Sequence, residues 1–171
     1  MPLTSDDRLR FGVCHAPELW PRERWDRDFE LMRAMGLECM RWGEGAWTLI
    51  EPAEDRFDFA LADEVISAAA ATGLGIILAT PTDAPPAWLE ERYPGAIALR
   101  EDGTPWHRHS RRMYDYTDPD YRRRCRRIVE ELARRYAGDE RIWAWQIDSE
   151  MWCHCDSLWG ERVRRSFQDW L

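Results

Sequence analysis

Four short apolar runs, each followed along the chain by a segment with helical spacing, restrict the fold more than any other feature. The runs occupy residues 11–14, 38–42, 75–79 and 142–147. Runs of this length suit strands that are covered on both faces. Because strands and helices alternate strictly, the sequence predicts a parallel sheet with its helices outside.

The helical segments carry recognisable start and stop signals. Pro21 opens the first helix and Gly36 ends it, while Gly73 closes the second. Asp118 before Pro119 is a strong helix start, because a capping side chain precedes a proline at the first helical position. The spacing of apolar residues predicts a last helix that carries Trp159, Val163, Phe167 and Trp170.

Long loops with polar and aromatic residues follow the predicted strands, so they should lie at one end of the sheet. This is the layout of a (β/α)8 barrel, whose active site is built from those loops. The predicted fold class is therefore α/β of the (β/α)8 TIM-barrel type, with only about the first four β/α units present. The whole chain, residues 1–171, is expected to form one domain. Residues 93–117 show no sustained period, which is typical of a functional or disordered loop.

The charge balance excludes several classes of partner. With 24 basic and 32 acidic residues the formal net charge is −8, which argues against nucleic acid and anionic membranes. The basic run 122–127 surrounds an apolar stripe, so a solvated helix face is favoured over a nucleic-acid patch. No apolar run reaches the roughly 20 residues of a membrane span, and residues 1–10 lack a signal-peptide region. We therefore expect a cytoplasmic protein whose five cysteines are mostly reduced core thiols.

Eleven tryptophans are an unusual number for this length. Aromatic rings in loops can stack on the C–H faces of sugars, although packing beneath the loops is the ordinary explanation. The loop tryptophans are Trp20, Trp47, Trp88, Trp106 and Trp152. No glycine-rich dinucleotide or P-loop motif follows a strand, so nucleotide binding has no support.

The last predicted strand ends abruptly in the polar residues Asp148, Ser149 and Glu150. A carboxylate at the C-terminal end of a strand in an α/β chain stands where such folds keep their catalytic groups. The alternative is a polar turn without a function, and the pattern alone does not separate the two.

Five motifs in a fixed order resemble one known family. They are Phe11-Gly-Val-Cys-His-Ala-Pro-Glu-Leu-Trp-Pro21, Met40-Arg-Trp-Gly-Glu-Gly-Ala-Trp47, Ala79-Thr-Pro-Thr-Asp-Ala-Pro-Pro-Ala-Trp-Leu89, Ser110-Arg-Arg-Met-Tyr114 and Trp145-Gln-Ile-Asp-Ser-Glu150. Together they resemble the N-terminal part of the catalytic barrel of glycoside hydrolase family 42, the bacterial β-galactosidases. The resemblance runs over essentially the whole chain.

The resemblance implies a retaining glycosidase that hydrolyses terminal β-D-galactosides with two carboxylates about 5–5.5 Å apart. Glu150 falls on the acid/base position and should have a raised pKa, through partial burial and a neighbouring carboxylate. Arg111 and Ser149 fall on positions that hold the sugar. Ser149 replaces the asparagine of the family and offers one donor instead of two, which puts catalytic efficiency in doubt.

The resemblance also bears on charged pairs and metals. Arg41 and Glu44 match a charged pair after the second strand, for which a buried structural role is favoured over a role in the site. Relatives with zinc carry four cysteines, but Asp115 stands at the first of these positions. Cys153, His154 and Cys155 are too few to make a good site alone, so no metal and no cofactor are expected. The resulting list is catalytic Glu150, substrate-binding Arg111 and Ser149, and no metal ligand.

The family nucleophile lies on a later strand that does not match any of these residues. The chain alone is therefore expected to be inactive, and to self-associate or to need a second polypeptide that completes the barrel. Its expected ligand is a galactoside or related oligosaccharide. The alternative function is a non-catalytic carbohydrate-binding or remnant half-barrel.

Overall fold

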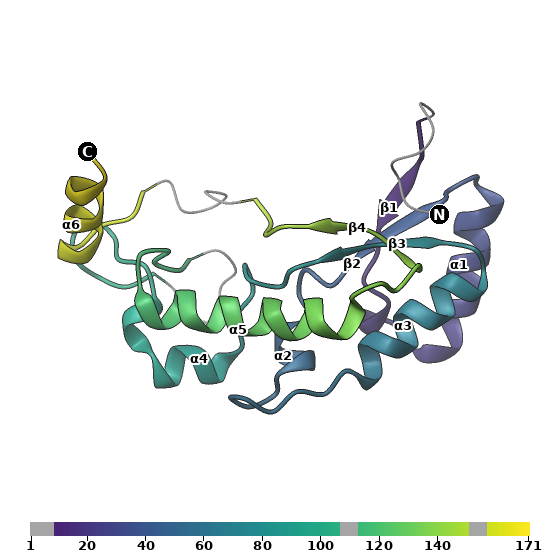
Figure 1. The fold of residues 1–171 in the computed structure, drawn as a ribbon, viewed down its shortest axis with the longest axis horizontal. Helices are drawn as coiled ribbons and strands as arrows, with labels where there is room; N and C mark the ends of the chain where they lie inside the picture. Colours follow the sequence, from purple (N-terminus) through teal and green to yellow (C-terminus); the bar gives the residue numbers. More distant parts are fainter. Residues whose placement is uncertain (1–8, 107–112, 151–156) are drawn as a thin grey trace.

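The computed structural model of the chain describes residues 9–106, 113–150 and 157–171. Four parallel strands form its sheet in the order β1-β2-β3-β4 (Figure 1). The strands are β1 (Gly12–Cys14), β2 (Cys39–Trp42), β3 (Gly75–Ala79) and β4 (Ile142–Gln146). The predicted strands are thus confirmed, each within one residue of its expected bounds.

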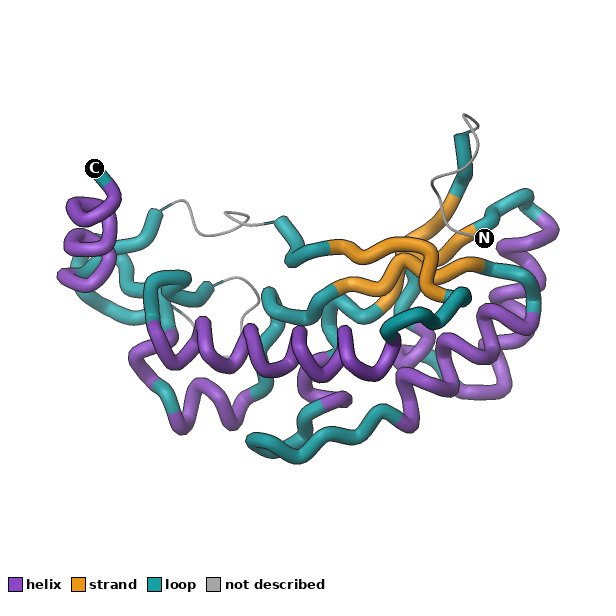
Figure 2. The backbone as a smooth tube through the Cα atoms, in the orientation of Figure 1, coloured by secondary structure: helices purple, strands orange, loops and turns teal. Residues whose placement is uncertain are grey.

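The helices that connect the strands lie on one face of the sheet, whereas the last helix follows β4 and lies apart from the sheet (Figure 2). The helices are α1 (Arg22–Ala34), α2 (Trp47–Ile50), α3 (Ala60–Ala71), α4 (Ala87–Arg92), α5 (Pro119–Tyr136) and α6 (Glu161–Trp170), with single 3-10 turns η1 (Pro17–Leu19) and η2 (Pro94–Ala96). The start signal of α5 is confirmed, because the Asp118 side chain accepts a hydrogen bond from the Tyr121 amide at 2.8 Å.

The hydrophobic core lies between the sheet and the helices. Met40 of β2 and Ile76 of β3 are fully buried there, because alternate residues of a strand point to the same face. Phe29 of α1, Ile66 of α3 and Leu132 of α5 cover them from the other side and are equally buried. The helical stripes expected from the sequence are the surfaces that make this core.

The opposite face of the sheet carries no helix among the described residues, and Trp143 of β4 packs closely against Gly75 of β3. A Cβ atom added to Gly75 would lie 2.0 Å from the ring of Trp143, so only glycine permits this approach. The pairing of β3 with β4 shifts register between Ile76 and Ile77, beside this contact. Cys14 on β1 is exposed, unlike the buried Cys39 beside it, so the expectation of core thiols fails at that position.

Two short helices were not expected from the sequence. Both α2 and α4 are too short to show a helical period, and tertiary contacts hold them in place. The indole nitrogen of Trp47 donates to the Glu51 carboxylate at 2.7 Å, and that of Trp88 donates to the Glu51 carbonyl at 2.9 Å. Trp159 lies before α6 instead of within it, where it bridges to Leu99.

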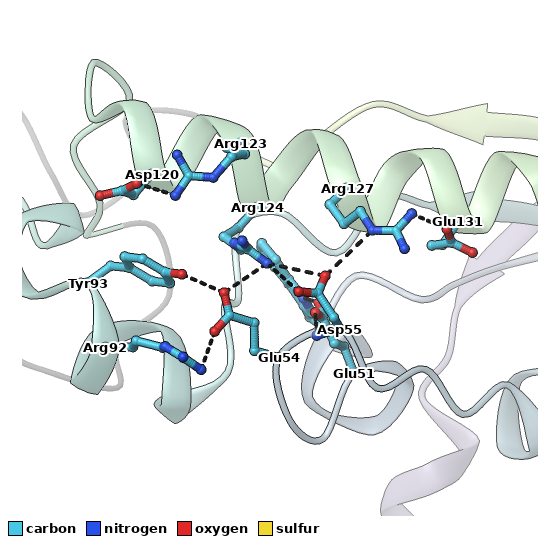
Figure 3. Close-up of polar contacts among 11 residues, drawn as sticks. Glu51, Glu54, Asp55, Arg92, Tyr93, Asp120, Arg123, Arg124, Arg127 and Glu131 are labelled. Atoms are coloured by element: carbon cyan, nitrogen blue, oxygen red, sulfur yellow. Dashed lines mark hydrogen bonds and ion pairs between the residues drawn. The ribbon is translucent and has the colours of Figure 1, made fainter.

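The basic run 122–127 lies on α5, and it is not simply the solvated helix face that the sequence predicted. Figure 3 shows that Arg124 reaches both Glu54, at 2.9 Å, and Asp55, at 3.3 Å, in the segment after α2. Arg92 and Tyr93 also contact Glu54. Part of the run therefore joins α5 to the segment after α2 and to the end of α4, which a charge pattern alone does not reveal.

Candidate active site

Loops from three strands meet at the C-terminal end of the sheet. The Asp148 amide, just after β4, donates to the Thr80 hydroxyl, just after β3, at 2.7 Å. The Ser149 hydroxyl donates to a carboxylate oxygen of Glu44, in the loop after β2, at 2.8 Å. The expectation that these loops share one end of a parallel sheet is confirmed.

The turn that carries Ser149 and Glu150 has an unusual backbone. Asp148 and Glu150 have φ angles of 58° and 46°, in the left-handed region that residues other than glycine rarely adopt. The turn is held by Gln146, whose amide donates to the Asp148 carbonyl at 2.8 Å, and by the contacts of Asp148 and Ser149. Each such residue costs on the order of 1–3 kcal/mol, and such strain clusters at functional sites.

Glu44 and Ser149 form the best-defined polar contact of the site. Glu44 is also paired with Arg41, whose guanidinium lies 3.0 Å from the other carboxylate oxygen. Ser149 is buried, and its single O–H bond is directed at Glu44. Toward a ligand the Ser149 oxygen can therefore act only as an acceptor while this contact is kept.

The sequence predicted the pairing of Arg41 with Glu44 but gave it a structural role away from the site. The structure instead places Glu44 against Ser149, and the Arg41 side chain keeps 37% of its surface exposed. A chain separation of 105 residues hides this contact in the sequence. The sequence predicted only that the loops after the strands share one end of the sheet.

Glu150 follows Ser149 at this end of the sheet and is exposed. The expected partial burial of its carboxyl group is therefore wrong for the chain as described. The reason is that β4 is an edge strand, so the sheet continues on only one of its sides. Arg111, the other predicted sugar-binding residue, lies outside the described residues.

The described residues bring together no group of three or more histidine, cysteine, aspartate or glutamate side chains that could hold a metal ion. Cys153, His154 and Cys155 lie outside the described part of the chain. Asp115, which stands at a cysteine position of zinc-bearing relatives, binds Arg162 of α6 at 2.8 Å. Its carboxylate also accepts from the Thr117 hydroxyl and amide, so it is held by protein groups.

Solved structures define the class of protein. The beta-galactosidase from the psychrophilic Marinomonas ef1 superposes with a TM-score of 0.89 and 37% identity, over 95% of this chain and 25% of that chain. The polyextremophilic beta-galactosidase of Halorubrum lacusprofundi gives the same TM-score and identity over 24% of its chain. These neighbours are (β/α)8 barrels, so the predicted fold class is confirmed: the chain has about four β/α units of a TIM barrel.

The family model for beta-galactosidases of glycoside hydrolase family 42 matches residues 14–171. The chain therefore belongs to glycoside hydrolase family 42. Beta-galactosidase of Thermus thermophilus is 43% identical over 162 residues, which are 94% of this chain and 25% of that protein. The Haloferax lucentense beta-galactosidase is 40% identical over 164 residues, 95% of this chain. The chain spans about a quarter of the length of these curated relatives.

None of the helices in the described ranges is long and apolar enough to cross a membrane.

Proposed function

We propose that this chain supplies the acid/base residue of a retaining β-galactosidase that hydrolyses terminal β-D-galactosides. Membership of family 42, together with beta-galactosidases among its relatives, supports the reaction class. The observation that carries the assignment of Glu150 is its position directly after Ser149, at the end of the sheet where the loops of three strands meet. Ser149 and Arg111 are proposed to position the sugar.

In the first step Glu150 gives its proton to the glycosidic oxygen as the bond from that oxygen to the anomeric carbon breaks. A second carboxylate forms a bond to the anomeric carbon at the same time. In the second step Glu150 takes a proton from a water molecule, whose oxygen bonds to the anomeric carbon and releases the carboxylate. We propose that the second carboxylate lies outside residues 1–171, so that the chain alone is inactive.

Residues 1–171 are proposed to be the N-terminal half of the catalytic (β/α)8 domain. The missing strands would come from further polypeptide, in the same chain or in a separate one. The proposed ligand is a galactoside or a related oligosaccharide. The formal net charge of −8 gives no support to a nucleic-acid partner.

The test is to complete the barrel by joining residues 1–171 to the remaining three quarters of the Thermus thermophilus relative, and then to change Glu150→Gln. Loss of general acid help should lower the rate on galactosides with poor leaving groups by about 10²–10⁴. Activated aryl galactosides should lose little in the first step, because their leaving groups need no proton. Steady-state and burst kinetics on both substrate types measure the difference.

Glu140→Gln is the matched control, because Glu140 is exposed and precedes β4, at the opposite end of the strand. It should leave both rates unchanged. An equal loss with both substrate types in the Glu150 variant would contradict the acid/base assignment. A completed barrel that binds galactosides without turnover would favour the alternative, a non-catalytic carbohydrate-binding module.

A further inference from the structure

A cleft of about 630 Å³ opens between the loop after β1 and the loop after β2. Arg41 and Glu44 line it at the candidate active site, where Glu44 also contacts Ser149. Arg22 of α1 and Glu64 of α3 line it as well. The cleft therefore extends from the end of the sheet to the surface between two helices, and its volume lies within the range of small-molecule sites.

Trp20 is the most exposed of the loop tryptophans that the structure describes. Trp47 is fully buried, whereas Trp20 lines the cleft with 46% of its surface exposed. The Arg24 guanidinium lies 4.0 Å from the centre of the Trp20 ring, and the Trp25 indole nitrogen donates to the Trp20 carbonyl at 3.2 Å. The ring is thus held in place beside an open cleft, which suits stacking on an apolar ligand face.

Glu18 supplies a fixed acceptor in the same cleft. One of its carboxylate oxygens accepts a hydrogen bond from the Trp42 indole nitrogen at 2.8 Å, which orients the group. An ionised carboxylate has about four acceptor sites, so this contact leaves capacity for ligand hydroxyls. A fixed carboxylate beside an aromatic ring is a combination that recognises a sugar by its hydroxyl groups and its C–H face.

The charges in the cleft disfavour an anionic ligand. Arg22 is bound to Glu64 at 2.6 Å and Arg41 to Glu44 at 3.0 Å, so both guanidinium groups of the lining have a carboxylate partner. Glu18 adds a further negative charge. A phosphate or carboxylate ligand would meet repulsion here, whereas a neutral polyhydroxyl ligand would not.

We propose that this cleft binds the sugar ring attached to the galactosyl unit, with Trp20 as its stacking platform and Glu18 as a hydrogen-bond acceptor. The identity of the ligand rests on the proposed galactosidase function, but the cleft itself rests on Trp20, Glu18 and the paired charges.

The test uses the 171-residue chain labelled with 5-fluorotryptophan and observed by ¹⁹F NMR. Titration with lactose, a galactose linked to a second ring, should shift the Trp20 signal, which Trp20→Phe assigns. Methyl β-galactoside, which lacks the second ring, should leave that signal in place. Trp20→Ala should weaken lactose binding roughly five- to tenfold, the usual worth of an aromatic contact.

Trp170→Ala, at an exposed tryptophan of α6, is the matched control and should not change lactose binding. The signals of the other tryptophans report whether Trp20→Ala still folds. Glu18→Gln is a second variant that keeps an oxygen for Trp42 and should also weaken lactose binding.

The outcomes separate this inference from the proposed function. Suppose that lactose binds but leaves the Trp20 signal unmoved, and that the Trp20 and Glu18 variants bind it equally well. This result would overturn the assignment of the cleft as a sugar site, and it would keep galactoside recognition by the chain. The opposite failure is a Trp20 shift with cellobiose, which contains no galactose, and none with lactose. That result would keep the cleft as a sugar site and overturn the galactoside assignment. No shift with either disaccharide would overturn the cleft.

Discussion

At the scale of single residues, buried carboxylates fix the loops that carry the site. Glu51 is fully buried at the end of α2, and it accepts from the Trp47 indole at 2.7 Å and from the Asp55 amide at 2.8 Å. Trp47 is three residues after Glu44, so Glu51 helps to fix the loop that reaches Ser149. Burial raises the pKa of Glu51 despite these two hydrogen bonds.

The raised pKa of Glu51 predicts a specific pH dependence of stability. An acid whose folded pKa lies above its unfolded value of about 4.3 adds stability below that value and loses it as pH rises through the folded pKa. The unfolding free energy of the parent chain should therefore fall relative to Glu51→Gln above about pH 4.3, by about 1.4 kcal/mol per pH unit between the two pKa values.

Urea unfolding of both proteins from pH 4 to 8 measures this difference. Its slope with pH is the readout, because the lost hydrogen bond from the Asp55 amide gives only a constant offset. Glu30→Gln, at an exposed position of α1, should give a flat difference. Parallel pH profiles for the parent and the Glu51 variant would contradict the prediction.

Single residues were also where the sequence was least informative. The position of Glu150 at the end of a strand could be predicted, because periodicity marks the strand and polarity marks its end. Its exposure could not be predicted, nor could the contact between Ser149 and Glu44. That contact depends on how two loops fold back over a shared neighbouring strand, and chain spacing carries no signal of this.

At the scale of elements, α6 is held to the rest of the chain by Arg162. Its guanidinium lies 2.8 Å from Asp115 and 2.7 Å from Asp118, and it donates to the Gly95 carbonyl at 2.5 Å. Both carboxylates are buried, and Asp118 is also the N-cap of α5. None of the α6 residues themselves is buried, so these polar contacts of Arg162 are a main attachment of α6 to the rest of the chain.

Arg162→Met should therefore destabilise the chain and release α6. Removing the guanidinium leaves two buried carboxylates without their cation, at a cost of about 1–3 kcal/mol, since Arg162 itself is partly exposed. Urea unfolding gives the loss, and hydrogen exchange of the α6 amides should become faster than that of α5. Arg165→Met, which removes an exposed pair with Glu161, is the control and should have no measurable effect. Unchanged exchange in α6 would contradict the proposed attachment.

Long helices with capping signals could be predicted from the sequence, and the short helices α2 and α4 could not. Asp118 and Pro119 marked the start of α5, since both act through local backbone geometry. The side-chain contacts of Glu54 in Figure 3 could not be predicted from the sequence. They join α5 to the segment after α2 and to the end of α4, so the partners become visible only once the chain has folded.

At the scale of the whole molecule, the sheet that the described residues form is open at both edges. Within it, strands β1 and β4 each have a neighbour on one side only, and Phe11 and Ile147 beside them are 65% and 73% exposed. Phe167 and Trp170 of α6 form a second exposed apolar surface. Open edges and apolar surfaces of this kind favour association with further chains.

We therefore expect the 171-residue chain to self-associate, and to do so more strongly at high salt, because the net charge of −8 opposes contact between copies until it is screened.

Ile147→Lys should weaken this association about tenfold or more, because burying an isoleucine side chain contributes about 1.5–3 kcal/mol and a lysine at a sheet edge blocks pairing. Leu31→Lys, at a half-exposed apolar position on helix α1 instead of a strand, is the matched control and should associate like the parent chain. Sedimentation velocity or light scattering over a concentration series, at low and high salt, gives the association constants.

Two outcomes would show that the edge of β4 does not drive association. One is a parent chain that stays monomeric throughout the series. The other is a loss of association as large in the Leu31 variant as in the Ile147 variant. The same samples, tested with a chromogenic galactoside, should show no turnover under the proposed mechanism, in which Glu150 is the acid/base and the second carboxylate lies outside residues 1–171, because a second copy would then supply only a second Glu150.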